Sequence, residues 1–286
     1  MNIRKEGTVT APKGYQAAAV AAEIKYKDRD DLVLIVSETD CAATAVFTRN
    51  QVVAAPVIAD RNTLARNSTS IRAVVINSGN ANASTGKFGY TNARLMQGLA
   101  AKELGCHADQ VLVMSTGVIG VQLPIDKVAD GITLAATQLS AKNGRSAAEA
   151  IMTTDTVPKH LAIQVALSAG TVTIGGMAKG SGMIHPDMAT MLSLLTTDAV
   201  VPPDVLDSLL KTAVKQSFNR ISVDGDTSTN DTVILLANGA SHIAIELHAD
   251  AKTIGDAPTY LCLQLAPETV QDGDGAPSFE ELLFSW

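Results

Sequence analysis

The chain has 286 residues, of which 46% are hydrophobic and 18% are charged, and its formal net charge is −7. This composition provides for a sizeable buried core and excludes a disordered chain, while the negative charge argues against a nucleic-acid-binding surface. The sequence has neither an apolar leader nor a run of about 18 apolar residues, so we expect a cytoplasmic protein without a membrane partner. The three cysteines, Cys41, Cys106 and Cys262, are too widely spaced to indicate a disulfide framework or a metal site.

Short apolar runs alternate with amphipathic segments along the chain. Runs of this kind are typical of buried strands, and apolar residues at helical spacing are typical of helices. We therefore predict strands over residues 32–36, 41–48, 72–76, 111–114, 161–167, 171–174, 191–196 and 232–236, and helices over 90–104, from Pro124 onward and over 203–216. Several strands follow one another directly, which favours an α/β or α+β fold with mixed sheets.

Polar and Gly-rich segments separate these elements. Residues 77–89 are rich in Asn, Ser and Gly, and residues 155–159 and 217–231 are also polar, so all three are predicted as loops. Residues 175–182 contain four glycines and one lysine, Lys179, and are predicted as a Gly-rich loop that leads toward the apolar strand at 191–196.

The pair Ala189-Thr190 lies directly before that strand. A threonine hydroxyl needs a base to become nucleophilic, and a freed α-amine with a pKa of about 7.7–8.0 can be that base. A small preceding residue would let the Thr190 hydroxyl attack the Ala189 carbonyl. The pair alone is also compatible with an ordinary threonine of a core strand.

Two further segments contain residues suited to acyl transfer. Thr116 and Gly117 follow a predicted strand, where a glycine N–H and a hydroxyl can stabilise an oxyanion; a plain turn is the alternative. Lys179 could bind the carboxylate of an amino acid, or could be a solvated loop lysine. The order A-K-G-S-G around it does not match a phosphate-binding loop.

Two other patterns are less informative. His185 could form a triad with Ser181 or a cysteine, but the sequence His-Pro-Asp is more typical of a tight turn. Residues 224–231 are rich in Asp and Asn but lack the downstream glutamate of a calcium-binding loop, so ordinary turn chemistry is favoured.

Taken together, these segments resemble the glutamate N-acetyltransferase family, also called ornithine acetyltransferase, which acts in arginine biosynthesis. The matching stretches are collinear over about residues 8–240 and comprise residues 12–25, 47–50, 76–86, 115–120, 152–159, 176–192 and 217–232. The resemblance implies layered mixed sheets flanked by helices, in a self-processing enzyme of the N-terminal-nucleophile type.

The resemblance also implies the roles of individual residues. Cleavage at Ala189-Thr190 would give an α chain of residues 1–189 and a β chain of 190–286, assembled as a heterotetramer of two copies of each. Thr190 would be the nucleophile that carries acetyl from N-acetylornithine to glutamate. Thr116 and Gly117 would form the oxyanion hole, and Thr153, Lys179 and Thr190 would bind substrate. Neither a metal nor a cofactor is implied, and the use of acetyl-CoA as donor stays open.

The C-terminal residues depart from the family pattern. Asp274 stands where the family has a substrate-binding glutamate, Ser278 stands where it has a lysine, and residues 280–286 match no family segment. We expect a truncated or frame-altered member. Two alternatives are therefore kept: an inactive remnant that at most binds a ligand or a full-length partner, and a related acyltransferase or amidohydrolase of secondary metabolism.

Overall fold

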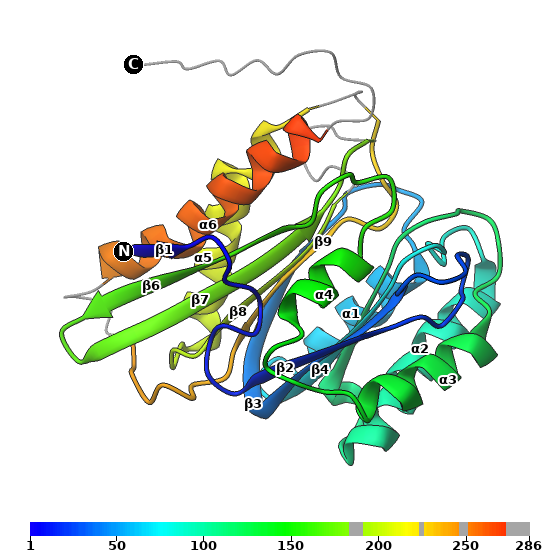
Figure 1. Cartoon of the computed structure of the whole chain (residues 1–286), viewed down its shortest axis with the longest axis horizontal. Coiled ribbons are helices and arrows are strands. Elements are labelled where there is room, and N and C mark those ends of the chain that lie inside the picture. The colour runs from blue at the N-terminus through cyan, green and yellow to red at the C-terminus, as the bar shows by residue number, and fades with distance from the viewer. Residues whose placement is uncertain (183–190, 223–225, 246–250, 273–286) are drawn as a thin grey trace.

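The computed structural model describes residues 1–182, 191–222, 226–245 and 251–272, the first five of the last segment by their backbone alone. The nine described strands form one hydrogen-bonded sheet at the centre of the molecule, which one long strand divides into two mixed parts, called here the first and the second sheet (Figure 1). The first sheet contains β1 (Asn2–Arg4), β6 (Lys159–Leu167), β7 (Gly170–Lys179), β8 (Leu192–Thr197) and β9 (Thr232–Ala237). The second contains β2 (Tyr15–Val20), β4 (Ile71–Asn77) and β5 (Val111–Ser115).

One long strand, β3 (Leu32–Phe47), belongs to both sheets. Its first half pairs with β2 and β4, and its second half pairs with β9. The register with β4 shifts between Val36 and Cys41, where the strand leaves one sheet for the other. The two predicted strands at 32–36 and 41–48 are therefore one bent strand.

Helices cover the outer faces of the two sheets (Figure 1). The first sheet is covered by α5 (Pro203–Gln216) and α6 (Ala251–Gln271), and the second by α1 (Ala55–Arg66), α2 (Gly86–Leu104) and α3 (Ile125–Ala136). The short helix α4 (Gly144–Ala150) contributes to the buried cluster between the sheets. Two single turns, η1 (Ala108–Gln110) and η2 (Phe218–Arg220), complete the described elements.

The predicted fold class is confirmed, since mixed sheets are stacked between outer helices. The sequence patterns did not predict β1, β2, α1, α4 or α6. The six residues of β2 are YQAAAV, and three consecutive alanines have low strand propensity. Packing overrides that propensity, because this strand forms a continuous antiparallel ladder with β3.

The prediction of a loop over the first part of residues 175–182 is wrong, because Gly175 to Lys179 are the second half of β7. Close packing on both faces explains the glycines. A Cβ on Gly175 would lie 2.1 Å from the Thr8 carbonyl oxygen, and one on Gly176 would lie 2.5 Å from a methyl carbon of Leu261 in α6. Glycine in a strand interior often marks such close approaches.

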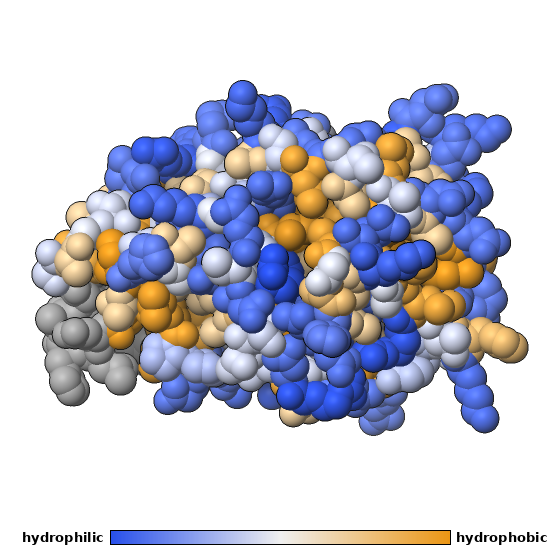
Figure 2. Space-filling view, turned by 90° about the horizontal axis from the view of Figure 1, so that it is seen from below, coloured by the Kyte–Doolittle hydropathy of each residue, from blue (hydrophilic) through white to orange (hydrophobic). Residues whose placement is uncertain are grey.

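The surface of the described residues is mixed. Figure 2 shows hydrophilic and hydrophobic residues interspersed over one face. None of the helices that the structure describes is both long and apolar enough to cross a membrane. Cys41, Cys106 and Cys262 are all free thiols, and the first and last are buried.

Candidate active site

The strand register brings three distant parts of the chain to one edge of the first sheet. Lys179 at the end of β7 pairs with Leu192 at the start of β8, and Leu192 pairs with Thr232 at the start of β9. Because β8 and β9 are parallel, the residues that precede them, Met191 and Asp231, lie at the same edge.

Lys179 extends from this edge toward two threonine hydroxyls. Its ammonium nitrogen Nζ donates to Thr153 Oγ1 at 2.7 Å and to Thr116 Oγ1 at 3.4 Å. Only 3% of Lys179 is exposed, so the alternative of a solvated loop lysine is wrong. Each hydroxyl oxygen accepts from the lysine and keeps its own hydrogen free to donate. The cluster can therefore direct one cation and two hydroxyl donors at a negatively charged group.

Asp155 is the anionic partner of this lysine, and the sequence reasoning placed it only in a polar loop. One of its carboxylate oxygens lies 3.8 Å from Lys179 Nζ. Burial lowers the pKa of Lys179, and the charge of Asp155 acts in the opposite direction. The same carboxylate accepts the N–H groups of Thr153 at 3.0 Å and Gly180 at 2.7 Å. Asp155 thus fixes the backbone beside both Thr153 and Lys179.

A second buried lysine links this site to the end of α6. Lys159 Nζ donates to Asp155 at 2.8 Å and to Asp272 at 2.5 Å, and all three side chains are at most 2% exposed. Asp272 also accepts the N–H of Thr156. These contacts join residues 153–159 to the residue that follows α6 directly. The spacing D-x-x-x-K is visible in the sequence, but the burial of Asp155 and Lys159 is not.

Thr116 and Gly117 follow β5, where the predicted strand end is confirmed. Gly117 has a φ of +131°, and a Cβ there would lie 2.2 Å from the carbonyl carbon of Gly79, so only glycine fits. Gly117 is exposed, and no described residue accepts a hydrogen bond from its N–H. A free N–H beside a free hydroxyl donor is an arrangement that can stabilise an oxyanion.

Buried asparagines hold the Thr116 segment in place. Asn230, which precedes Asp231, donates through Nδ2 to the carbonyl oxygens of Ser115 at 2.9 Å and Ala81 at 2.6 Å. Asn77 accepts from the Ser115 hydroxyl at 2.6 Å. The start of β9 is therefore hydrogen-bonded to the end of β5, which brings the two sheets together at the site.

The structure joins Thr116, Thr153 and Lys179 directly, with Gly117 adjacent to Thr116. The remaining predicted residues, Ala189, Thr190 and Asp274, lie outside the described residues, which resume at Met191 after the first two. His185 and Asp224 also lie outside them. Among the described residues, no three His, Cys, Asp or Glu side chains are grouped as metal ligands.

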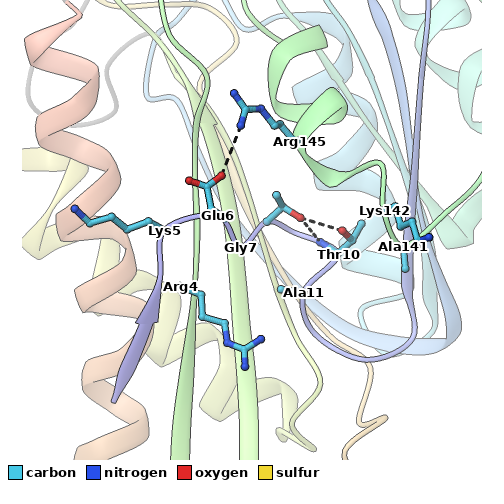
Figure 3. Close-up of a pocket in the computed structure, with 10 residues that line it drawn as sticks. Arg4, Lys5, Glu6, Gly7, Thr10, Ala11, Ala141, Lys142 and Arg145 are labelled. Carbon is cyan, nitrogen blue, oxygen red and sulfur yellow. Dashed lines mark hydrogen bonds and ion pairs between the residues drawn. The ribbon is translucent and has the colours of Figure 1, made fainter.

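A separate groove of about 570 Å³ lies between residues 4–11 and residues 141–145 (Figure 3). Glu6 and Arg145 face one another across it, with 3.6 Å between their charged atoms. Lys179, Thr116 and Thr153 do not line this groove, so it is distinct from the candidate active site.

Comparison with known proteins shows the family to which this chain belongs. The model of the ArgJ family matches residues 16–282. The chain belongs to the ArgJ family. The arginine biosynthesis bifunctional protein ArgJ of Symbiobacterium thermophilum is 49% identical over 281 residues, which are 96% of this chain and 69% of that protein. The predicted family resemblance is thereby confirmed.

Solved structures agree with this membership and with the fold. The ornithine acetyltransferase of Mycobacterium tuberculosis, solved with ornithine, is 38% identical, with a TM-score of 0.60 over 67% of this ArgJ-family chain and 99% of that chain. The L-aminopeptidase D-Ala-esterase/amidase of Ochrobactrum anthropi is 13% identical, with a TM-score of 0.55 over 97% of this chain and 90% of that chain. The latter is described as a variant of the Ntn hydrolase fold, so the two chains share that layered fold, while self-processing stays a prediction.

Proposed function

We propose that this chain transfers an acetyl group from N-acetylornithine to glutamate in arginine biosynthesis, through an acetyl-threonine intermediate on Thr190. The observation that carries the proposal is the convergence of Lys179, Thr116 and Thr153 at the sheet edge where β8 begins. A buried ammonium group with two hydroxyl donors suits a small substrate that carries a carboxylate and an amide carbonyl.

Self-cleavage would come first. The Thr190 hydroxyl oxygen attacks the Ala189 carbonyl carbon, the Ala189–Thr190 C–N bond breaks, and water hydrolyses the resulting ester. The products are residues 1–189, with a new carboxylate, and residues 190–286, with a free α-amine.

Acetyl transfer then uses the new amine as base. It takes the proton from Thr190 Oγ as that oxygen attacks the acetyl carbonyl carbon, and the Gly117 N–H and Thr116 hydroxyl stabilise the oxyanion. The proton passes to the departing amine of ornithine. Glutamate then attacks the acetyl ester with its own amine, and the proton returns to Thr190 Oγ. Lys179 and Thr153, with Asp274 in place of the family glutamate, would hold the substrate.

We also propose how the chains assemble and which second acetyl donor to test. Two α and two β chains would form a cytoplasmic heterotetramer, and acetyl-CoA is a further donor to be assayed. The substrates are small molecules, which fits a site built from the hydroxyls of Thr116 and Thr153 and the ammonium group of Lys179.

Mass spectrometry of the purified protein after incubation tests the first step. We expect two fragments that meet at Ala189/Thr190 in the native chain and one intact species in Thr190→Ala. A native chain that stays whole contradicts self-processing. Transfer of labelled acetyl from N-acetylornithine to glutamate tests the second step, with a parallel assay containing acetyl-CoA. Calorimetric binding of ornithine or glutamate without turnover would instead support the binding-only alternative.

A further inference from the structure

Asp231 is a buried carboxylate with an unused oxygen at the edge of the candidate site. The residue lies directly before β9 and is 0% exposed. Its Oδ1 accepts the Met191 N–H at 3.0 Å. Its Oδ2 is buried without a hydrogen-bond partner among the described residues. Such an atom in a folded protein calls for an explanation, because leaving a buried polar atom unpaired is costly.

The backbone holds Asp231 firmly in this position. Its carbonyl oxygen accepts the Thr48 N–H at 2.8 Å, and the following Thr232 N–H donates to the Met191 carbonyl at 3.1 Å. The carboxylate is therefore fixed between the end of β3 and the start of β8. A rigid position suits a group that must meet a partner at a defined place.

The surroundings of the Asp231 carboxyl oppose its ionisation, so a nearby cation would stabilise its charged form. Burial raises the pKa of Asp231 to about 8, against the opposing effects of the Met191 N–H, the nearby Ser228 and Thr48 hydroxyls, and Lys179. Lys179 is the one charged residue among those influences, and it is already paired with Asp155. Asp231 therefore lacks a close cation of its own among the described side chains.

The chain connectivity indicates where that cation would arise. The nitrogen of Met191 is bonded to the carbonyl carbon of Thr190, so Asp231 Oδ1 accepts from an N–H that only one residue of the chain separates from the Thr190 α-nitrogen. In the uncut chain this nitrogen is a neutral amide. After the cut it is an amine that becomes an ammonium group each time it takes a proton.

We propose that Asp231 is a positioning residue that acts as counter-ion to the α-ammonium group of Thr190. This inference rests on the proposed function, because the ammonium group exists only after cleavage. The carboxylate would stabilise the amine when it holds the Thr190 Oγ proton and would orient it toward that oxygen. No additional atom or electron is transferred, since the proton moves only between Oγ, the amine and the leaving group.

A purely structural role makes a different prediction. If Asp231 only accepts the Met191 N–H, an amide oxygen can replace the carboxylate oxygen and the chemistry of the amine is unaffected. Asp231→Asn therefore separates the two roles. Asp60→Asn is a matched control, because Asp60 is also 0% exposed, accepts the Val113 N–H at 2.9 Å and has a pKa raised by burial, but belongs to the buried face of α1.

The first test follows the Asp231 carboxyl directly by NMR of protein with ¹³C-labelled aspartate. In the uncut Thr190→Ala chain we expect its titration near pH 8, assigned by its loss in Asp231→Asn. In the processed native protein the midpoint should fall by at least about one unit, as for a carboxylate that gains a cation within 4–6 Å. Equal midpoints in the cut and uncut chains would overturn the inference.

The second test is the pH profile of kcat/KM for acetyl transfer. The amine must be neutral to act as base, and a neighbouring carboxylate raises its pKa. Asp231→Asn should therefore move the acid limb to lower pH by about 1–3 units, while Asp60→Asn leaves it in place. A loss of rate without this movement would show a structural role. If the native chain is never cleaved, the proposed function itself is refuted. If the chain is cleaved and active but Asp231→Asn leaves the acid limb of the pH profile in place, only the role of Asp231 is refuted.

Discussion

The Asp155 carboxylate lies 3.8 Å from the Lys179 ammonium group, and both side chains are almost completely buried. Asp155 also accepts a hydrogen bond from Lys159, so two buried cations share this carboxylate, and Asp272 is a second anion for Lys159. Burial would raise the pKa of Asp155, but Lys179 and Lys159 outweigh it and hold that pKa below its usual value. The integrity of the candidate site therefore depends on a residue that would not itself touch the reacting atoms.

Asp155→Asn should lower the free energy of unfolding by about 3–5 kcal/mol, because it leaves the buried Lys179 without its anion and the buried Lys159 with Asp272 alone. Urea denaturation measures this loss. Asp109→Asn is the control, since Asp109 forms half-exposed ion pairs with Arg66 and Arg94. Its substitution should lower the free energy of unfolding by about 0–1 kcal/mol. Similar losses in the two variants would contradict the importance of burial.

The stability difference between the native chain and Asp155→Asn should also depend on pH. The folded-state pKa of Asp155 is depressed, so its contribution is complete above the unfolded-state pKa of about 3.9 and is lost as pH falls through the folded-state value. Denaturation curves from neutral to acid pH should therefore converge for the two proteins. Curves that stay parallel at acid pH would show that Asp155 is not ionised in the native chain.

The KM of the carboxylate-bearing substrate should rise at alkaline pH. Lys179 binds a carboxylate only when protonated, and burial lowers its pKa, with Asp155 partly compensating. The rise should therefore begin below the ordinary lysine value of about 10.4. Lys179→Arg should remove the rise, because arginine stays protonated over this range. A native KM that is flat up to pH 10 would exclude Lys179 as the carboxylate ligand.

Gly117→Ala should reduce both stability and activity. The new Cβ would lie 2.2 Å from the Gly79 backbone, and the φ of +131° at position 117 is one that alanine rarely adopts. We therefore expect the free energy of unfolding to fall by about 1–3 kcal/mol and Thr116 to be displaced. Gly120→Ala is a matched control in the same loop, with a φ of +83° but open space around its Cβ position. Thermal melts and acetyl-transfer rates should change more at 117 than at 120.

Thr116→Ala should lower kcat about 10²–10³-fold, as expected for the loss of one oxyanion donor. Its KM should change less, because the oxyanion develops only in the transition state. Thr91→Ala is the control, since the exposed Thr91 hydroxyl donates only to a carbonyl of its own helix. A loss of only a few-fold in kcat would leave Gly117 as the main oxyanion donor.

The sequence by itself determined the class of fold, the main strands and the family, and it predicts the residues for the chemistry. Apolar β-branched runs such as Leu32–Val36 form buried strands wherever they pack, and the motifs around Thr116, Thr153 and Lys179 predict their roles through resemblance. Strands and motifs are local features, so residues that are neighbours in the chain are enough to predict them. Local propensity also explains the errors, since the glycines before Lys179 indicated a loop.

Only the tertiary structure decided which polar residues support the site. Asp155, Lys159 and Asp272 form one buried network, although 113 positions separate Lys159 from Asp272, and Asp231 contacts Met191 across 40 positions. In the sequence these residues are ordinary members of polar turns. Their charges matter because neighbouring strands and α6 exclude water around them, and the cost of burying a charge depends on its surroundings rather than on its neighbours in the chain.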